Sequence, residues 1–160
     1  MIRISTRGRY ALRAMVDLAL HSDGEPVARH DIAERQNISA DYVAQLFRQL
    51  QDADLVEGVK GPGGGYRLAR DAAEIHAGDV VEAVEGPVAL VHCVEPSDEP
   101  VCNRVDRCVT HQLWKRLSGV MKEFLDATTL QDLCDEAQQL HSHSSLDGGR
   151  GVGGNPLCNL

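Results

Sequence analysis

A run of glycines, Gly61-Pro62-Gly63-Gly64-Gly65, narrows the possible folds more than any other segment of this chain. The residues on either side, 55–60 and 66–70, are short apolar and polar segments typical of strands, so the glycines predict the turn of a β-hairpin. Glycine supplies the backbone freedom that such a turn needs. A nucleotide-binding phosphate loop would instead open a helix and end in Lys-Ser/Thr, whereas a strand pattern follows here.

Three helical patterns precede the hairpin. Apolar residues recur at helical spacing from Tyr10 to Ala19, with Ser5 or Thr6 as the possible N-cap and Ser22-Asp23-Gly24 as the end. A shorter pattern covers residues 27–36, and a third helix is predicted from Ala40 to about Ala53 with Ser39 as its cap. The apolar stripe of that third helix consists of Val43, Leu46, Phe47 and Leu50.

Two short helices joined by a turn of about three residues are typical of a helix-turn-helix, although a generic three-helix unit has the same pattern. The hairpin that follows favours the first interpretation, because it has the place and composition of a wing. We therefore predict a mainly α fold with a small β-hairpin: a winged helix-turn-helix domain over residues 1–70, followed by a long dimerisation helix.

A winged helix of this kind predicts a double-stranded DNA partner. The third helix would enter a major groove and the hairpin the adjacent minor groove, while Arg and Lys side chains contact phosphates. Two-fold symmetry predicts a pseudo-palindromic operator bound by a homodimer. The candidate DNA-binding residues are Arg7, Arg9, Ser39, Ala40, Asp41, Tyr42, Gln45, Arg48, Lys60, Gly61, Pro62, Gly63 and Arg67.

The net charge of −8 argues against nucleic acid only when the whole chain is averaged. Residues 1–70 carry a net charge of +1 and residues 71–160 a net charge of −9, so the acidic excess lies in the second half. No apolar run approaches the roughly 18 residues of a membrane span, and the first residues lack the apolar stretch of a signal peptide. We therefore expect a cytoplasmic protein.

The second half is predicted to hold a further short helix near 77–84, a loop from 90 to 108 and a long helix from about Thr110. One face of the long helix is apolar, which favours dimerisation, although an intramolecular core helix has the same pattern. Another helix starts at Thr128 or Thr129. We assign residues 71–140 to a cysteine-bearing loop and dimerisation helices, and 141–160 to a disordered tail rich in Ser, Gly and Asn. The apolar face consists of Leu113, Leu117, Val120, Met121, Phe124 and Leu125.

Three cysteines and a histidine, Cys93, Cys102, Cys108 and His111, form the pattern C-x8-C-x5-C-x2-H in this loop and the next helix. A reducing compartment disfavours disulfides, so metal or redox chemistry is the better interpretation. Three thiolates with one imidazole suit either a structural zinc or an iron-sulfur cluster. Cys134, on an apolar helix face, is predicted to be a buried thiol. A Cys/His enzyme is disfavoured because no further catalytic pattern accompanies these residues.

Several motifs together resemble the bacterial winged-helix family of IscR-like iron-sulfur cluster regulators, which also includes the nitric-oxide-sensing NsrR and the cysteine-metabolism repressor CymR. The similarity covers about residues 1–140. Two features depart from IscR: the first cysteine gap is three residues longer, and Ala44 stands where IscR has a glutamate. The motifs are Ser5-Thr6-Arg7-Gly8-Arg9-Tyr10-Ala11, Ile32-Ala33-Glu34-Arg35-Gln36-Asn37-Ile38-Ser39, Gln45-Leu46-Phe47, Gly61-Pro62-Gly63-Gly64-Gly65-Tyr66 and Cys108-Val109-Thr110-His111-Gln112-Leu113-Trp114.

The resemblance implies a homodimeric, non-enzymatic regulator that binds a 2Fe-2S cluster through Cys93, Cys102, Cys108 and His111. It further implies that DNA binding reports iron-sulfur status and controls cluster-assembly genes. The alternative is a zinc-stabilised or apo winged-helix repressor that senses a small molecule, nitric oxide or a partner protein. A third possibility, an iron-sulfur carrier that does not bind DNA, is disfavoured by the hairpin and the helix-turn-helix spacing.

Overall fold

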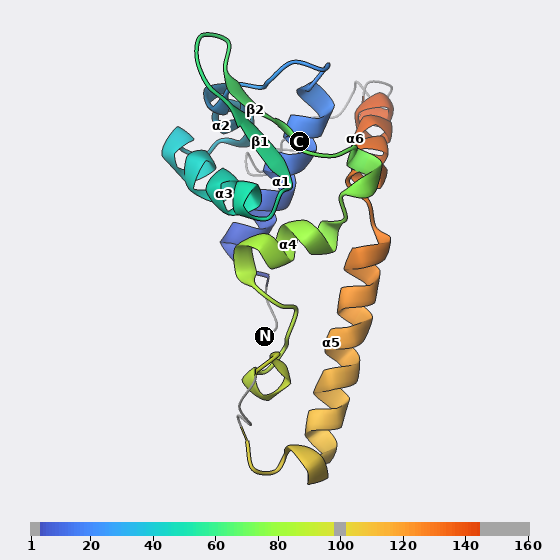
Figure 1. The fold of residues 1–160 in the computed structure, drawn as a ribbon. Coiled ribbons are helices and arrows are strands. Elements are labelled where there is room, and N and C mark those ends of the chain that lie inside the picture. Colours follow the sequence, from blue (N-terminus) through green and yellow to red (C-terminus); the bar gives the residue numbers. More distant parts are fainter. Residues whose placement is uncertain (1–3, 98–101, 145–160) are drawn as a thin grey trace.

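Six α-helices and one antiparallel hairpin make up the part of the chain that the computed structural model describes, residues 4–97 and 102–144 (Figure 1). The prediction of a mainly α fold with a small hairpin is confirmed. Three single 3-10 turns, η1 Ala72–Glu74, η2 His92–Val94 and η3 Val105–Arg107, lie in the connections. The regular elements are α1 Thr6–His21, α2 Arg29–Gln36, α3 Ala40–Asp52, β1 Val56–Val59, β2 Gly65–Leu68, α4 Ala77–Glu85, α5 Val109–Ala127 and α6 Leu130–Ser144.

Polar caps start α1 and α3 at the residues that the sequence predicts. Ser5 is the N-cap of α1, because its hydroxyl accepts hydrogen bonds from the backbone N–H groups of Arg7 and Gly8. Ser39 caps α3 and accepts a bond from the N–H of Tyr42 at 3.1 Å. Between α2 and α3, Asn37 adopts a left-handed conformation with φ 52°, which asparagine tolerates better than most residues. These local features produce the tight helix-turn-helix.

The hairpin pairs Val56 with Leu68 and Val59 with Gly65 at its two ends. Its turn contains Gly61 at φ 96° and Gly63 at φ 74°, backbone conformations that side-chain-bearing residues rarely adopt. Strand β2 also pairs with the segment before α2, since the backbone groups of Val27 and Tyr66 exchange two hydrogen bonds of 2.8 Å. The wing is therefore attached directly to the helix-turn-helix.

One apolar core holds the helix-turn-helix, α4 and α6 together. Its largest fully buried side chains include Met15 and Leu18 of α1 and Phe47 of α3, and Val80 of α4 joins them. The four residues predicted as the apolar stripe of α3 are all buried. From α6, Cys134 enters the same core at 4% exposure, which confirms the predicted buried thiol.

Helix α6 continues through Ser144, whereas the sequence predicts that a disordered tail starts at His141. The last turns of α6 lie beside α1 and α2, where Gln138 and His141 line a cavity together with Asp17 and Arg35. Residues 145–160, including Cys158, lie outside the described residues.

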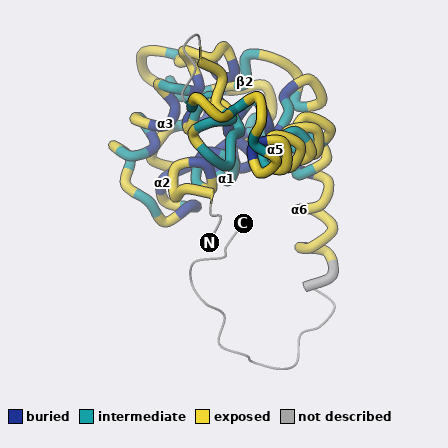
Figure 2. The backbone as a smooth tube through the Cα atoms, turned by 90° about the horizontal axis from the view of Figure 1, so that it is seen from below, coloured by how far each residue is buried: buried dark blue, intermediate teal, exposed yellow. Residues whose placement is uncertain are grey.

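Helix α5 extends away from the other helices, with the loop that holds η2 beside it (Figure 1). Much of its surface is exposed (Figure 2). Only His111 and Ser118 of α5 are buried, and they lie on the face opposite the exposed apolar side chains. Within the described ranges, no helix has the length and apolarity needed to cross a membrane. The exposed apolar side chains are Val109, Leu113, Leu117, Val120 and Phe124.

Candidate nucleic-acid interface and cysteine loop

The outer face of α3 presents the polar side chains that the sequence predicts for base contact. Gln45 and Arg48 are exposed one turn apart, and Asp41 is exposed at the start of the helix. Tyr42 is half-buried because its ring packs edge-on against Tyr10 of α1, with 6.1 Å between centroids. The fold thus fixes Tyr42 and leaves the longer polar side chains free to meet a partner.

The tip of the hairpin, in the same winged helix-turn-helix as α3, is also exposed. Lys60, Gly61, Pro62 and Gly63 are all exposed there. Arg67 differs from the prediction of a free phosphate contact, since its guanidinium forms a 2.7 Å ion pair with Glu57 on the opposite strand. Both partners are about half exposed, so the pair stabilises the protein little. Breaking it to free Arg67 for a phosphate would therefore cost little free energy.

Arg7 and Arg9 are exposed in the first turn of α1. The same turn is held to the end of α4, because the Ser5 hydroxyl donates a 2.8 Å hydrogen bond to the Glu85 carboxylate. A Cβ atom at Gly8 would lie only 2.0 Å from Glu85 Oε1, so glycine permits this close approach. The position of these arginines is therefore coupled to the helix that leads into the cysteine loop.

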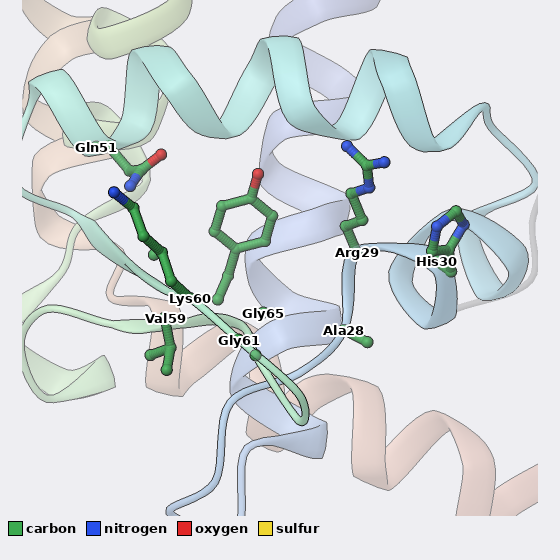
Figure 3. Close-up of a pocket in the computed structure, with 11 residues that line it drawn as sticks. Ala28, Arg29, His30, Gln51, Val59, Lys60, Gly61 and Gly65 are labelled. Atoms are coloured by element: carbon green, nitrogen blue, oxygen red, sulfur yellow. The ribbon is translucent and has the colours of Figure 1, made fainter.

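A cavity of about 430 Å³ lies between the start of α2, the end of α3 and the hairpin (Figure 3). Arg29 and His30 of α2 and Lys60 of the hairpin line it, and Gln51 of α3 closes another side. Arg29 and His30 were not predicted as site residues. The Val27–Tyr66 pairing joins the segment before α2 to the hairpin, and the local sequence pattern of residues 27–36 does not reveal that pairing.

Cys108 and His111 are brought together by the start of α5. Cys108 is the N-cap residue, and its Sγ lies 3.1 Å from the Thr110 hydroxyl. Hydrogen bonding to this hydroxyl, helped by the backbone N–H of His111, holds the pKa of the Cys108 thiol below its ordinary value. A thiol so placed is more readily a thiolate, which is the form that binds metals.

His111 is buried at 7% exposure, and its Nδ1 has no hydrogen-bond partner among residues 4–97 and 102–144. An orphaned buried polar atom costs about 1–3 kcal/mol. The loop before Cys93 is attached to the same face of α5, because the N–H of Leu90 donates a 3.1 Å bond to the buried Ser118 hydroxyl. Turn η2, which contains Cys93, packs against α5 as well.

The chemistry of these residues fits a metal centre, but the structure does not assemble one. Within residues 4–97 and 102–144, no three His, Cys, Asp or Glu side chains lie close enough together to hold a metal ion. Cys93 and Cys102 are partly buried. In the sequence, Cys93 precedes and Cys102 follows residues 98–101, which are outside the described part. The structure thus places Cys108 with His111, and Cys93 near the same helix.

The sequence matches a known protein family over most of its length. Residues 4–136 match the Rrf2 family, described as an iron-dependent transcriptional regulator. The chain belongs to the Rrf2 family. Among its relatives is the HTH-type transcriptional regulator IscR of Vibrio parahaemolyticus, 43% identical over 94% of this chain and 88% of the relative. IscR of Vibrio cholerae is 46% identical over 91% of this chain and 83% of its own.

Solved Rrf2-type structures have the same architecture. The structure of CymR, the global cysteine regulator of B. subtilis, is 38% identical with a TM-score of 0.68, and covers 85% of this chain and 98% of its own. The IscR of T. potens is 34% identical with a TM-score of 0.65, and covers 93% of both chains. The winged-helix prediction and the family resemblance are therefore confirmed. This Rrf2 protein is a transcriptional regulator, and its relatives support DNA binding.

Proposed function

We propose that this Rrf2 regulator is a homodimer that binds a pseudo-palindromic DNA operator and holds a 2Fe-2S cluster through Cys93, Cys102, Cys108 and His111. The observation that carries the cluster assignment is the buried His111 Nδ1, which lies one helical turn from Cys108 and has no hydrogen-bond partner in the described part of the chain. Similarity to proteins named IscR supports the same assignment. The division of the chain at residue 70, between the DNA-binding unit and the part that holds the cysteine loop and the dimerisation helix, is part of this proposal.

In the proposed complex, α3 enters a major groove and the hairpin tip meets the adjacent minor groove. Tyr42, Gln45 and Arg48 contact bases or phosphates from the outer face of α3, and Ser39, Ala40 and Asp41 lie at its groove-facing start. Gly61, Pro62 and Gly63 let the hairpin approach the DNA without long side chains. Arg7, Arg9, Lys60 and Arg67 bind phosphates, and Arg67 exchanges Glu57 for the DNA in doing so.

A second copy of the chain covers the apolar face of α5. Val120 is 61% and Phe124 71% exposed there, which is costly for a lone helix that extends away from its core. A palindromic operator requires two recognition helices related by a two-fold axis. Pairing α5 with its symmetry mate provides both the burial of the apolar face and the required symmetry.

The thiolates of Cys93, Cys102 and Cys108 and the imidazole of His111 would bind the cluster at the start of α5. A bound cluster supplies a centre whose presence tracks iron-sulfur supply. To bind one cluster, the thiolates of Cys93 and Cys102 would have to lie beside Cys108 at the start of α5. The Leu90–Ser118 bond already holds one end of the 90–108 loop on the correct face of the helix.

Helix α4 connects this loop to the DNA-binding unit. Lys122 of α5 forms a 2.7 Å ion pair with Glu82 of α4, and a Cβ at Gly78 would meet the Asp126 carboxylate of α5. On its other side α4 packs against α1 and α3. We propose that bringing Cys93 and Cys102 together with Cys108 and His111 changes the angle between α5 and α4, and hence the separation of the two recognition helices in the dimer.

Anaerobic purification tests the ligand assignment. The parent protein and Cys102→Ala are compared by visible absorption and by iron, sulfide and zinc analysis. We expect coloured parent protein with near-equal iron and sulfide, both lost in the variant. Colourless protein with stoichiometric zinc, or protein without metal after reconstitution, would contradict the cluster assignment and leave the DNA-binding assignment intact. The targets we propose are genes for iron-sulfur cluster assembly, as the name IscR of the relatives supports.

A further inference from the structure

We propose that the cavity between α2, α3 and the hairpin holds one backbone phosphate of the bound DNA, gripped by Arg29 and Lys60. This inference rests on the proposed DNA binding and adds to it a subsite and a residue, Arg29, that the sequence does not point to. The cavity of about 430 Å³ is large enough for a phosphodiester group and too small for a duplex.

The charge around the cavity favours an anion. Arg29, His30 and Lys60 line it, and its lining residues, all from the described part of the chain, include no Asp or Glu. This is unusual in a chain of net charge −8, in which several other cations face carboxylates. Arg35 pairs with Asp17, Arg67 with Glu57 and Lys122 with Glu82. The cations of the cavity are thus grouped on a surface whose lining contains no carboxylate.

The position of the cavity favours DNA as the source of the phosphate. One sugar-phosphate backbone separates each major groove from the neighbouring minor groove. If α3 lies in the first groove and the hairpin in the second, that backbone must cross the space between them, which is where the cavity opens. Figure 3 shows Arg29 and Lys60 on two sides of this space, with α3 running along it.

The walls of the cavity are built firmly enough to preorganise the two cations. The two Val27–Tyr66 hydrogen bonds of 2.8 Å join the α2 wall to the hairpin wall. Gly65 makes this possible, since a Cβ there would lie 2.1 Å from the Val27 carbonyl oxygen. The Tyr66 ring packs on Phe47 of the core, 4.4 Å between centroids, and so fixes the hairpin against α3. Little conformational entropy is then lost at the backbone when the phosphate binds.

The test is equilibrium DNA binding of the full chain at several salt concentrations. The probes are a duplex that the parent protein selects from a random pool and a scrambled duplex of equal length. The variants are Arg29→Ala and Arg29→Lys, and the matched control is Lys115→Ala, which removes an exposed charge from the face of α5 opposite its apolar side chains. A phosphate contact contributes about 0.9 to the slope of log K against log salt, so Arg29→Ala should lower the slope by about 1.8 in a dimer.

Raising the salt from 50 to 200 mM weakens DNA binding by both proteins. Because its slope is smaller, Arg29→Ala should lose about 12-fold less affinity over this range than the parent does. We expect equal weakening on both duplexes, a parent-like slope for Arg29→Lys and for Lys115→Ala, and a non-additive effect when Arg29→Ala is combined with Lys60→Ala. An unchanged slope, weakening of the selected duplex alone, or full additivity with Lys60→Ala would overturn the shared phosphate site. A parent protein that binds neither duplex would overturn the proposed function itself.

Discussion

Asp17 of α1 accepts two 2.8 Å hydrogen bonds from Arg35 of α2, one from Nε and one from the terminal Nη2. The carboxylate is buried at 2% exposure, and Gln36 of α2 also donates to it at 3.1 Å. Gln36 in turn accepts a bond from Arg13 of α1. This network fixes α1 against α2, and the hydrogen bonds that Arg35 donates to Asp17 raise the pKa of Arg35 above its ordinary value.

Asp17→Asn is therefore expected to lower the free energy of unfolding by about 2 kcal/mol, less than for a fully buried pair because Arg35 is one-third exposed. Denaturant unfolding followed by circular dichroism measures the change. Asp23→Asn, in the exposed turn after α1, is the matched control and should unfold like the parent. Equal unfolding midpoints for Asp17→Asn and the parent would show that the network does not stabilise the fold.

Arg48→Ala tests the assignment of α3 as the recognition helix. Arg48 is exposed on the outer face of α3, so its loss should leave the fold intact and weaken operator binding by about 1–3 kcal/mol. Fluorescence anisotropy with the selected duplex measures the affinity, and repeating the selection measures site preference. The control is Arg107→Ala, an exposed arginine in η3. Unchanged affinity together with unchanged site preference would remove Arg48 from the interface.

Phe124→Glu tests the dimer. Phe124 is 71% exposed on the apolar face of α5, so a charge there should prevent association without damage to the core of the monomer. Sedimentation analysis should show a monomer, and operator affinity should fall because only one half-site is held at a time. Glu123→Gln alters the neighbouring exposed position and should remain dimeric. A dimer of Phe124→Glu with parent stability would place the interface elsewhere.

Cys134 gives the protein a predictable pH dependence. Burial in the core raises the pKa of its thiol from 9.0 to about 11. Because the pKa is higher in the folded state, the thiol of the unfolded chain ionises first as the pH rises. The stability that the neutral Cys134 thiol contributes is therefore present below pH 9 and is lost between about pH 9 and about pH 11. The loss should amount to about 2 kcal/mol.

The free energy of unfolding, measured under reducing conditions between pH 8 and pH 11, tests this expectation. Cys134→Ala removes the titrating group, so the difference in stability between parent and variant should shrink across this range. A constant difference would mean that the Cys134 thiol ionises equally well in the folded and unfolded states.

The same burial predicts that iodoacetamide reacts with the partly exposed Cys93, Cys102 and Cys108 before Cys134.

Local chemistry made most of the DNA-binding unit predictable. The caps at Ser5 and Ser39 and the stripe ending at Leu50 are determined by neighbouring residues, and the structure confirms them. The predicted strands are right in place, although β2 begins one residue earlier, at Gly65, because its end pairs with Val59. The composition of residues 61–65 leaves few alternatives to a turn.

Long-range contacts were not predictable in this way. The Val27–Tyr66 pairing, which brings Arg29 to the hairpin, joins residues almost 40 positions apart, and no local pattern encodes it. Similarly, the polar composition after Leu140 does not reveal that α6 continues to Ser144 or that His141 lines a cavity with Asp17 and Arg35. The spacing of Cys93, Cys102, Cys108 and His111 identifies a donor set, but spacing alone does not specify how the loop between the first two cysteines closes.

The most direct test of the account is the operator affinity of the parent protein with its cluster, compared anaerobically with the same protein after cluster removal and with Cys102→Ala. Iron and sulfide analysis of each sample confirms its state. We expect a change in affinity of about tenfold or more between the loaded and cluster-free parent at one or more operators, with Cys102→Ala matching the cluster-free protein. Equal affinity of all three proteins for every operator, with the cluster shown to be present in the first, would contradict it.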